Sequence, residues 1–169
     1  MGRFVKHLPD KGRGLDAGCG SGRDIRSFLE KGFLVTAFDA SAAMVNNATQ
    51  FSGIDVRHAT FSDLTDKDEY DGIWCCASLL HVAEAEFADA ITRLTQALKP
   101  GGVIYLSFKY GAGERVSRGR YFFDHTEESL ADALRFLPEL KIVSMWKTVD
   151  ARPHRNNDFW LNAICRRVY

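Results

Sequence analysis

Cysteine is scarce in this sequence and shows no spacing typical of a metal site or a disulfide framework. The four cysteines are Cys19, Cys75, Cys76 and Cys165, and no two of them form a CxxC pair. Cys75 and Cys76 lie inside an apolar run, so we expect buried free thiols and no bound metal. Free thiols persist in a reducing compartment, which favours the cytoplasm.

Long apolar runs and an excess of either charge are also missing. No apolar stretch approaches the roughly 20 residues of a membrane-spanning helix, and no charged-then-apolar leader opens the sequence. The 22 basic residues balance the 22 acidic ones, which argues against a nucleic acid or a membrane surface as a partner. The length of 169 residues predicts one soluble domain over 1–169, as a monomer or a weak homodimer.

Short apolar runs alternate with amphipathic segments, which is typical of βαβ units and of a largely parallel sheet. Residues 109–125 lack periodicity and contain three glycines. We predict a mobile loop there that closes over a substrate. Strands are predicted at about 13–17, 33–38, 54–58, 72–76, 103–108, 141–149 and 158–166. Helices are predicted at about 23–31, from the N-cap Ser41 onward, at 84–98 up to the breaker Lys-Pro-Gly-Gly, and from the N-cap Thr126 to Leu134. In the helix at 84–98, one apolar stripe is formed by Phe87, Ile91, Leu94 and Leu98.

A glycine-rich turn follows the first predicted strand. Residues 15–22 read Leu-Asp-Ala-Gly-Cys-Gly-Ser-Gly, and glycines there let the backbone approach a ligand closely. In a doubly wound sheet, a nucleotide-like ligand lies over the end of this strand. The alternative is a plain connection between strand and helix.

Asp39 ends the second predicted strand, 21 positions after Gly18. An acid about 20 residues beyond such a turn is placed to accept hydrogen bonds from both hydroxyls of a ribose. Its alternative role, as N-cap of the following helix, is weaker because Ser41 is available.

The turn differs from the phosphate-binding loops with which it can be confused. A dinucleotide fingerprint needs G-x-G-x-x-G, but Arg23 occupies the third glycine position, and no G-x-x-x-x-G-K-[ST] loop is present. A ribose-bearing ligand without a pyrophosphate fits better, and a nicotinamide oxidoreductase is disfavoured.

Together these residues resemble the class I S-adenosylmethionine-dependent methyltransferases. The resemblance spans nearly the whole chain, through 15–22 (LDAGCGSG), 38–39 (FD), 70–74 (YDGIW), 79–82 (LLHV) and 98–102 (LKPGG). The stretches CASLLHV, SFKYG and GRYFFDHTEESL resemble the small bacterial tellurite-resistance-like members of the methyltransferase type 11 group. The resemblance implies an α/β fold: a Rossmann-like, doubly wound, mostly parallel seven-stranded sheet with an antiparallel last strand and helices on both faces.

The resemblance also implies S-adenosylmethionine as the cofactor and S-adenosylhomocysteine as the product. Gly18, Cys19 and Gly20 would line the methionine and ribose portion of the cofactor, and Asp16 would support the turn from beneath. Arg23 is a candidate partner for the methionine carboxylate, or else a solvated residue of the first helical turn.

The other half of the implied cofactor site holds the ribose and the adenine. Asp39 would hold both ribose hydroxyls, and Ala40 would lie against the adenine. Many relatives place an acid after the third strand, where this sequence has Thr60 and Phe61. We therefore expect Phe61 to pack on the adenine edge, with Asp63 as the alternative partner.

The implied reaction is methyl transfer to a small-molecule acceptor, which can be anionic. The carbonyl of Cys76 or Ala77 would accept from the methionine ammonium. His81 is a candidate general base, with a capping role as its alternative. Arg120 is the favoured counter-charge for an anion. Further candidates around the mouth of the site are Lys109, Tyr110, Tyr121, His125, Arg152 and Arg155.

A non-catalytic S-adenosylmethionine-binding regulatory module is the alternative function, because its cofactor site would look the same. Amino-group methylation of adenine or glutamine is disfavoured, since Cys-Ala-Ser-Leu stands at 76–79 where such enzymes carry N/D-P-P-Y/F/W. Relatives usually carry a helix or two before the first strand that cover the acceptor. Only about a dozen residues precede it here, so residues 109–125 are expected to do the covering unless the sequence is trimmed.

Overall fold

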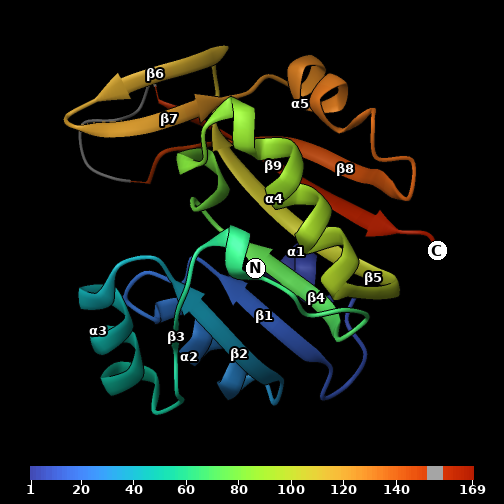
Figure 1. The fold of residues 1–169 in the computed structure, drawn as a ribbon. Coiled ribbons are helices and arrows are strands. Elements are labelled where there is room, and N and C mark those ends of the chain that lie inside the picture. Colours follow the sequence, from blue (N-terminus) through green and yellow to red (C-terminus); the bar gives the residue numbers. More distant parts are fainter. Residues whose placement is uncertain (152–157) are drawn as a thin grey trace.

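The computed structural model describes residues 1–151 and 158–169, and its centre is a seven-stranded sheet (Figure 1). The strand order is β3-β2-β1-β4-β5-β9-β8. The strands are β1 (Arg13–Ala17), β2 (Leu34–Asp39), β3 (Arg57–His58), β4 (Tyr70–Cys75), β5 (Leu98–Lys109), β8 (Leu140–Val149) and β9 (Phe159–Arg167).

Strand direction follows the prediction from the sequence. The pairs from β3 through β5 are all parallel, whereas β9 runs antiparallel to both β5 and β8. The mostly parallel sheet with an antiparallel last strand is therefore confirmed. The chain winds outward in opposite directions from β1 and β4, and in open α/β sheets ligands bind at the carboxyl ends of the strands beside such a switch point.

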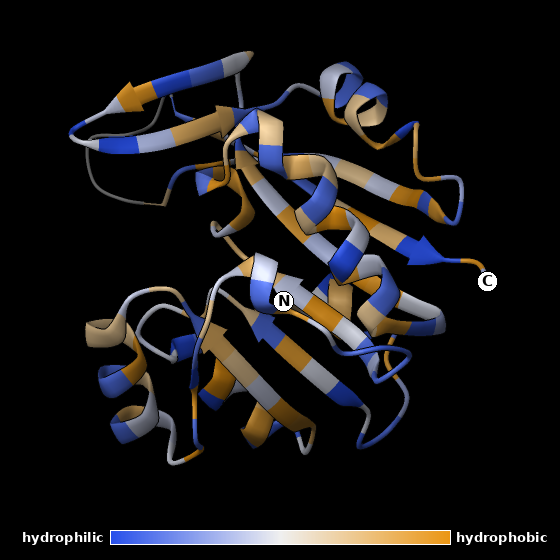
Figure 2. Ribbon diagram, viewed as in Figure 1, coloured by the Kyte–Doolittle hydropathy of each residue, from blue (hydrophilic) through white to orange (hydrophobic). Residues whose placement is uncertain are grey.

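Helices cover both faces of the sheet (Figure 1). The helices α1 (Gly2–Val5), α2 (Arg23–Glu30) and α3 (Ala42–Ser52) pack on one face, and α4 (Glu84–Ala97) and α5 (Glu127–Leu134) pack on the other. In Figure 2 the apolar residues follow the central strands and the inward sides of the helices. No helix in the described part of the chain is long and apolar enough to cross a membrane.

Both helix caps expected from the sequence are present. The Ser41 Oγ accepts a hydrogen bond from the Met44 amide at 3.4 Å, and the Thr126 Oγ1 accepts from the Ser129 amide at 3.2 Å. These side chains satisfy amides that the first turn of a helix leaves without partners. The clearest predicted helix, α4, buries the stripe Phe87, Ile91 and Leu94 against β4 and β5.

The predicted loop at 109–125 is wrong, because most of that segment forms a β-hairpin. Strands β6 (Gly113–Ser117) and β7 (Arg120–Asp124) pair antiparallel and are joined by Arg118 and Gly119. Both linking residues have positive φ, at 52° and 71°, as in the type I′ turn that matches the twist of hairpin strands. Since β6 is exposed almost throughout, the sequence shows no alternation that would reveal a strand.

Two boundaries also differ from the prediction. Helix α4 ends at Ala97 and β5 begins at Leu98, so the breaker at 99–102 lies within a strand. The register moves from Tyr70↔Leu98 to Gly72↔Val103, which accommodates the extra residues as a bulge. Strand β3 is shorter than expected, and α1 was not predicted at all.

Candidate functional site

The glycine-rich turn after β1 folds back against the end of β2. The amides of Gly18 and Cys19 both donate to the Phe38 carbonyl oxygen, at 2.9 and 3.0 Å. Gly18, Gly20 and Gly22 have φ values of 77°, 56° and 82°, a region that other residues adopt only with strain. The turn is therefore held at the carboxyl edge of the sheet, where a ligand was expected.

The segment after β4 meets this turn. A Cβ on Gly18 would overlap the Cβ of Ser78, and the Ser78 Oγ donates to the Ala17 carbonyl oxygen at 2.6 Å. Ala77 has a φ of 53°, and its amide donates to the Ser107 Oγ at 2.8 Å. The structure thus brings the glycine turn beside residues 76–78, which include Cys76 and Ala77, the two residues that the family resemblance implied as partners of the cofactor.

Asp39 links the turn to the end of β2. Its Oδ2 accepts from the Gly20 amide at 2.8 Å, and its Oδ1 accepts from the Ser41 amide at 2.9 Å. Each carboxylate oxygen keeps a lone pair for a further donor, and the residue is only half-buried. The Ser41 side chain provides the N-cap of α3, so Asp39 is not needed for that role. Its remaining lone pairs can accept hydrogen bonds from hydroxyl groups of a ligand.

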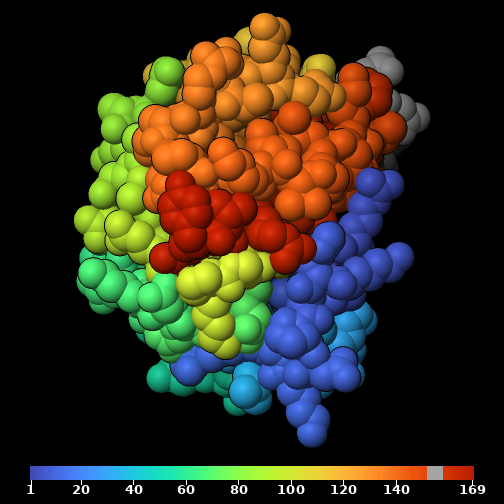
Figure 3. Space-filling view, turned by 90° about the vertical axis from the view of Figure 1, so that its right-hand side faces the viewer, coloured from blue at the N-terminus to red at the C-terminus, as the bar shows by residue number. Residues whose placement is uncertain are grey.

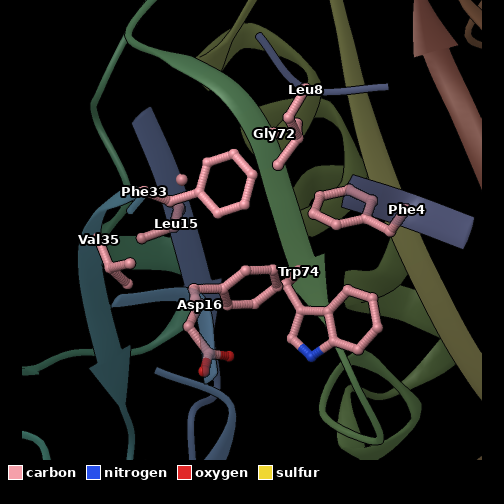
Figure 4. A pocket seen from close by; sticks show the side chains of 10 residues that line it. Phe4, Leu8, Leu15, Asp16, Phe33, Val35, Gly72 and Trp74 are labelled. Atoms are coloured by element: carbon pink, nitrogen blue, oxygen red, sulfur yellow. The ribbon is translucent and has the colours of Figure 1, made fainter. Parts of the chain in front are cut away.

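Asp16 lies on β1 directly before the turn and is 3% exposed. Burial, followed by the charges of Asp24 and Asp39, raises the pKa of the Asp16 carboxyl well above its usual range. Within the described residues its Oδ2 has no hydrogen-bond partner. In Figure 4 this carboxylate points away from the apolar hollow lined by Phe4 and Phe33. A buried carboxylate oxygen without a partner is costly unless a ligand supplies a donor.

The adenine side of the expected site contains Phe61 and Asp63. Phe61 packs edge-on against Phe38, with ring centroids 5.4 Å apart. The Asp63 Oδ2 accepts from the Thr60 amide at 2.8 Å and from its hydroxyl at 2.7 Å. These hydrogen bonds lower the pKa of Asp63. Asp63 is thus already engaged in a capping box, which leaves Phe61 as the better candidate to line an adenine.

Arg23 does not point at a carboxylate site in this structure. Its Nε is 3.0 Å from the Asp24 Oδ1, and its side chain is 78% exposed. The other oxygen of Asp24 accepts from the Trp74 indole at 2.9 Å. Arg23 therefore adopts the solvated arrangement that was its alternative, and its contact with a methionine carboxylate stays a prediction.

His81 ends a short 3₁₀ helix (Leu79–His81) and contacts the hairpin. Its Nδ1 lies 2.7 Å from the Tyr121 carbonyl oxygen, and its ring packs against Phe122 at 4.9 Å. A carbonyl only accepts, so Nδ1 carries the hydrogen and Nε2 of the neutral ring keeps its lone pair. Burial and the charge of Arg120 lower the pKa of His81, which keeps this ring neutral.

The hairpin also supplies the N-terminal cap that α4 lacks. Ala83, the N-cap residue, offers no side-chain hydrogen bond. Instead, the Glu84 amide donates to the Glu114 Oε1 at 2.7 Å and to the Tyr121 Oη at 3.1 Å. Sequence reasoning missed Glu114, because no local signal links it to a helix that starts 30 residues earlier.

Arginines of the hairpin gather around Phe122. The Arg115 guanidinium lies 4.4 Å from that ring and forms an ion pair with Asp124. The Arg120 guanidinium lies 5.8 Å from the same ring. Among residues 1–151 and 158–169, no carboxylate forms an ion pair with Arg120.

Lys109, at the end of β5, forms a buried ion pair. Its Nζ is 2.6 Å from the Asp150 Oδ2, with side chains 11% and 3% exposed, and it lies 4.2 Å from the centre of the Trp160 ring. Its charge is thus largely compensated inside the protein. Two other predicted cations, Arg152 and Arg155, lie outside the described residues.

Tyr110 and His125 are engaged in internal contacts. The Tyr110 hydroxyl donates to the Glu127 Oε2 at 2.9 Å. His125 is 1% exposed, its Nδ1 lies 3.1 Å from the Ser129 Oγ, and burial lowers its pKa to about 4. Both residues lie near the base of the hairpin, and within the described residues the buried His125 Nε2 has no hydrogen-bond partner. Their position at the mouth of the site stays a prediction. The four cysteines are free thiols, and no His, Cys, Asp and Glu group in the described chain is placed to hold a metal ion.

Comparison with known proteins identifies the family. The family described as "Methyltransferase domain" matches residues 15–102, which contain the glycine turn, Asp39 and β4. The chain belongs to this family. It is a class I S-adenosylmethionine-dependent methyltransferase domain.

Individual relatives agree with this assignment. Malonyl-[acyl-carrier protein] O-methyltransferase of Salmonella typhimurium is 29% identical over 147 residues, or 85% of this chain and 47% of that protein. The chain thus spans about half the length of the curated relatives it matches first. The 1,6-didemethyltoxoflavin-N1-methyltransferase of Burkholderia thailandensis, solved with bound 1,6-didemethyltoxoflavin and S-adenosylhomocysteine, is 27% identical. Its TM-score is 0.82 over 99% of this chain and 76% of that one. A methyltransferase of Methanosarcina mazei, 19% identical, shares the fold with a TM-score of 0.87 over 99% and 98% of the two chains.

The residues at the edge of the sheet fit S-adenosylmethionine, the cofactor of this family. A Cβ on Gly20 would meet no atom within 4 Å, so the turn leaves open space on the side where a ligand is expected. Asp39 offers lone pairs for two ribose hydroxyls, and the orphaned oxygen of Asp16 suits a ligand that carries hydrogen-bond donors or a positive charge. When bound, this cofactor supplies an electrophilic methyl group.

Proposed function

We propose that this protein transfers the methyl group of S-adenosylmethionine to a small-molecule acceptor at the carboxyl edge of β1, β4 and β5. The observation that carries the proposal is the hydrogen bond from the Gly20 amide to Asp39. It joins the turn and the ribose-binding acid into one rigid unit beside residues 76–78. Gly18, Cys19, Gly20 and Asp39 would hold the cofactor, and the carbonyl of Cys76 or Ala77 would accept from its ammonium group.

His81 would act as the general base for an acceptor that must lose a proton. The Tyr121 carbonyl fixes the hydrogen on Nδ1, so Nε2 can take the proton of a hydroxyl or N–H group as that group forms its bond to the methyl carbon. The packing of the ring on Phe122 fixes its orientation during this step.

The alternative function is a regulatory module that binds the cofactor without catalysis. Such a module needs the glycine turn and Asp39 but has no use for a basic nitrogen. A neutral histidine with a fixed tautomer, close to an arginine without a carboxylate partner, favours catalysis over this alternative.

The acceptor is proposed to be a small molecule with negative charge or high electron density. The β6–β7 hairpin would cover it, in the role first given to a loop, and Arg120 would supply the counter-charge. The matched relatives act on different acceptors, as their names state. The resemblance to tellurite-resistance-like methyltransferases adds chalcogen oxyanions to the candidate methyl acceptors. We also propose that 1–169 acts in the cytoplasm as a single domain, a monomer or a weak homodimer.

A labelled-methyl assay tests the proposal. Purified protein and S-adenosylmethionine labelled in the methyl group are incubated with a panel of small metabolites and chalcogen oxyanions. The proposal expects a labelled product from at least one acceptor, and at least a tenfold loss of rate in His81→Gln at unchanged cofactor affinity. Tight cofactor binding with no transfer to any acceptor would favour the regulatory module.

A further inference from the structure

A side chain of β5 holds the chain where it leaves β4. The parallel ladder between these two strands ends at the pair Cys75↔Leu106. Beyond it, the Ala77 amide donates to the Oγ of Ser107 at 2.8 Å, where a continued ladder would use a backbone carbonyl of β5. The Ser107 hydroxyl therefore takes the place of the ladder at the point where the chain turns away.

Ser107 is itself held firmly. It lies on β5, between β4 and β9, and pairs with Asn162 of β9. Figure 3 shows one side of the molecule, with the N-terminal residues in blue beside the C-terminal strands in orange and red and the yellow start of β5 between them. Ser107 lies further along this strand and is 3% exposed. The sheet thus fixes the position of its hydroxyl.

Ala77 has a strained backbone. Its φ of 53° is a value that a residue with a Cβ adopts only at a cost in free energy. Such a conformation persists where the surroundings hold it, and it is frequent at ligand sites. Two contacts hold it here, the hydrogen bond to Ser107 and the one from the Ser78 Oγ to the Ala17 carbonyl oxygen.

The N–H of Ala77 and the carbonyl of Cys76 belong to the same peptide unit. This peptide bond is trans, and in a planar trans peptide the N–H and the C=O point in opposite directions. The N–H is directed at Ser107 on β5. The Cys76 carbonyl is therefore directed to the other side of β4, where β1 and the glycine turn lie.

The Cys76 carbonyl also lacks the partner that a sheet would give it. From the register of β1 and β4, a continued ladder would bring the Cys19 amide to this oxygen. The amides of Gly18 and Cys19 donate instead to the Phe38 carbonyl oxygen. In the part of the chain that the structure describes, no group donates to the Cys76 carbonyl oxygen. This oxygen can accept a hydrogen bond from a ligand on the turn.

We propose that Ser107 is a positioning residue for the cofactor: it holds the Ala77 amide and thereby directs the Cys76 carbonyl at the ammonium group of S-adenosylmethionine. Ser107 acts through the peptide unit and does not touch the cofactor. Of the two carbonyls that the sequence left open, this assigns Cys76 and not Ala77. The inference rests on the proposed function, because it takes the cofactor to lie on the glycine turn.

Calorimetry with two ligands tests the role of Ser107 without a methyl acceptor. The ligands are S-adenosylhomocysteine and its deamino analogue, in which hydrogen replaces the amino group. The parent protein should bind S-adenosylhomocysteine at least tenfold more tightly than the analogue. In Ser107→Ala the affinity for S-adenosylhomocysteine should fall at least tenfold, whereas the affinity for the analogue should stay within twofold. A general loss of structure would weaken both ligands alike.

A matched control removes another buried serine hydroxyl. Ser52 is 8% exposed, and its Oγ donates to the Ala48 carbonyl oxygen at 2.6 Å within α3. Ser52→Ala should leave the affinity for each ligand within twofold of the parent value.

Carbonyl ¹³C NMR on the parent protein identifies the accepting oxygen even if Ser107→Ala does not fold. The carbonyl signal of Cys76 should move further on saturation with S-adenosylhomocysteine than with the deamino analogue. The carbonyl signal of Ala77 should respond equally to the two ligands.

Three results would overturn the inference: equal losses for the two ligands in Ser107→Ala, unchanged S-adenosylhomocysteine affinity in that variant, or an amino-dependent response at Ala77 instead of Cys76. The proposed function fails differently. The expected ligand pattern together with no methyl transfer to any acceptor would favour the regulatory module and leave the role of Ser107 intact.

Discussion

The Nδ1 of His81 lies 2.7 Å from the main-chain carbonyl oxygen of Tyr121, which is 40 positions further along the chain. Because a carbonyl cannot donate, this contact assigns the tautomer of the imidazole and leaves its Nε2 basic. The hairpin thus does more than cover the site. It sets the protonation pattern of the residue proposed to remove a proton from the acceptor.

Arg120 should influence catalysis through His81 as well as through any anion. Burial and the Arg120 charge lower the pKa of His81 below its usual 6.5. The neutral, basic ring is present above that pKa and is lost as pH falls through it. Methyl transfer should therefore decline only below about pH 6.5. In Arg120→Gln the pKa of His81 should rise, and the fall in the methyl-transfer rate on the acid side of the pH profile should begin at a higher pH.

NMR titration of the His81 ring checks this prediction without an acceptor. The control is Arg118→Gln, which removes a similar charge from the tip of the same hairpin. A pKa of His81 that is the same in Arg120→Gln and in the parent protein would show that burial alone sets it.

Asp39 should matter for cofactor affinity, and the fold should survive its replacement although the amides of Gly20 and Ser41 lose their acceptor. Asp39→Ala removes the acceptor for two ribose hydroxyls, each worth about 1.5–3 kcal/mol before water compensates. Affinity for S-adenosylmethionine should fall at least tenfold by titration calorimetry. Asp63→Ala, which breaks a surface capping box, should change it by less than about twofold. If Asp63→Ala lost more affinity for S-adenosylmethionine than Asp39→Ala, the acid that holds the cofactor would be Asp63, after β3, and not Asp39.

Alanine substitutions at two glycines of the turn should have different effects on unfolding free energy and on cofactor affinity. Gly18→Ala combines a φ of 77° with an overlap on Ser78, and we expect a loss of about 2–4 kcal/mol in unfolding free energy. Gly20→Ala has a φ of 56° and open space around the added atom, so the loss should be about 1 kcal/mol.

Because the open space beside Gly20 is the expected position of the cofactor, Gly20→Ala should weaken S-adenosylmethionine binding at least tenfold. Urea unfolding and calorimetry on the same preparations check both effects. If Gly20→Ala binds the cofactor normally, the ligand does not approach the turn at that residue.

His125 should make the fold sensitive to acid. Burial lowers its pKa to about 4, from 6.5 in an unfolded chain. A depressed histidine pKa means that the unfolded state binds the proton first, so stability is lost as pH falls from about 6.5 toward 4. The shift corresponds to about 3 kcal/mol over that range. Unfolding free energy measured against pH should show this slope in the parent protein and a smaller one in His125→Asn. Equal slopes would mean that other groups dominate the acid response.

Features encoded by neighbouring residues could be predicted from the sequence. The turn at 15–22, Asp39 at the end of β2, the caps Ser41 and Thr126, and the stripe of α4 depend on spacing within one or two elements. The structure confirms the caps and the stripe, and it places the turn beside the segment after β4. The βαβ pattern indicated a largely parallel sheet, and the doubly wound arrangement with an antiparallel last strand was implied by the family resemblance.

Features that depend on contacts between distant segments could not be predicted. The hairpin is exposed on most of β6, so hydrophobic alternation does not mark it. The tautomer of His81 and the cap from Glu114 to Glu84 both cross more than 25 positions. Arg23 shows a second reason why prediction fails. Its guanidinium contacts the neighbouring Asp24, and sequence spacing alone cannot decide between Asp24 and the methionine carboxylate as its partner.

Titration calorimetry with S-adenosylmethionine, S-adenosylhomocysteine and NAD tests the central claim most directly. The account predicts saturable binding of both sulfur nucleosides and no binding of NAD, because the turn carries Arg23 where a dinucleotide site needs glycine. Binding of NAD together with no response to either sulfur nucleoside would contradict it.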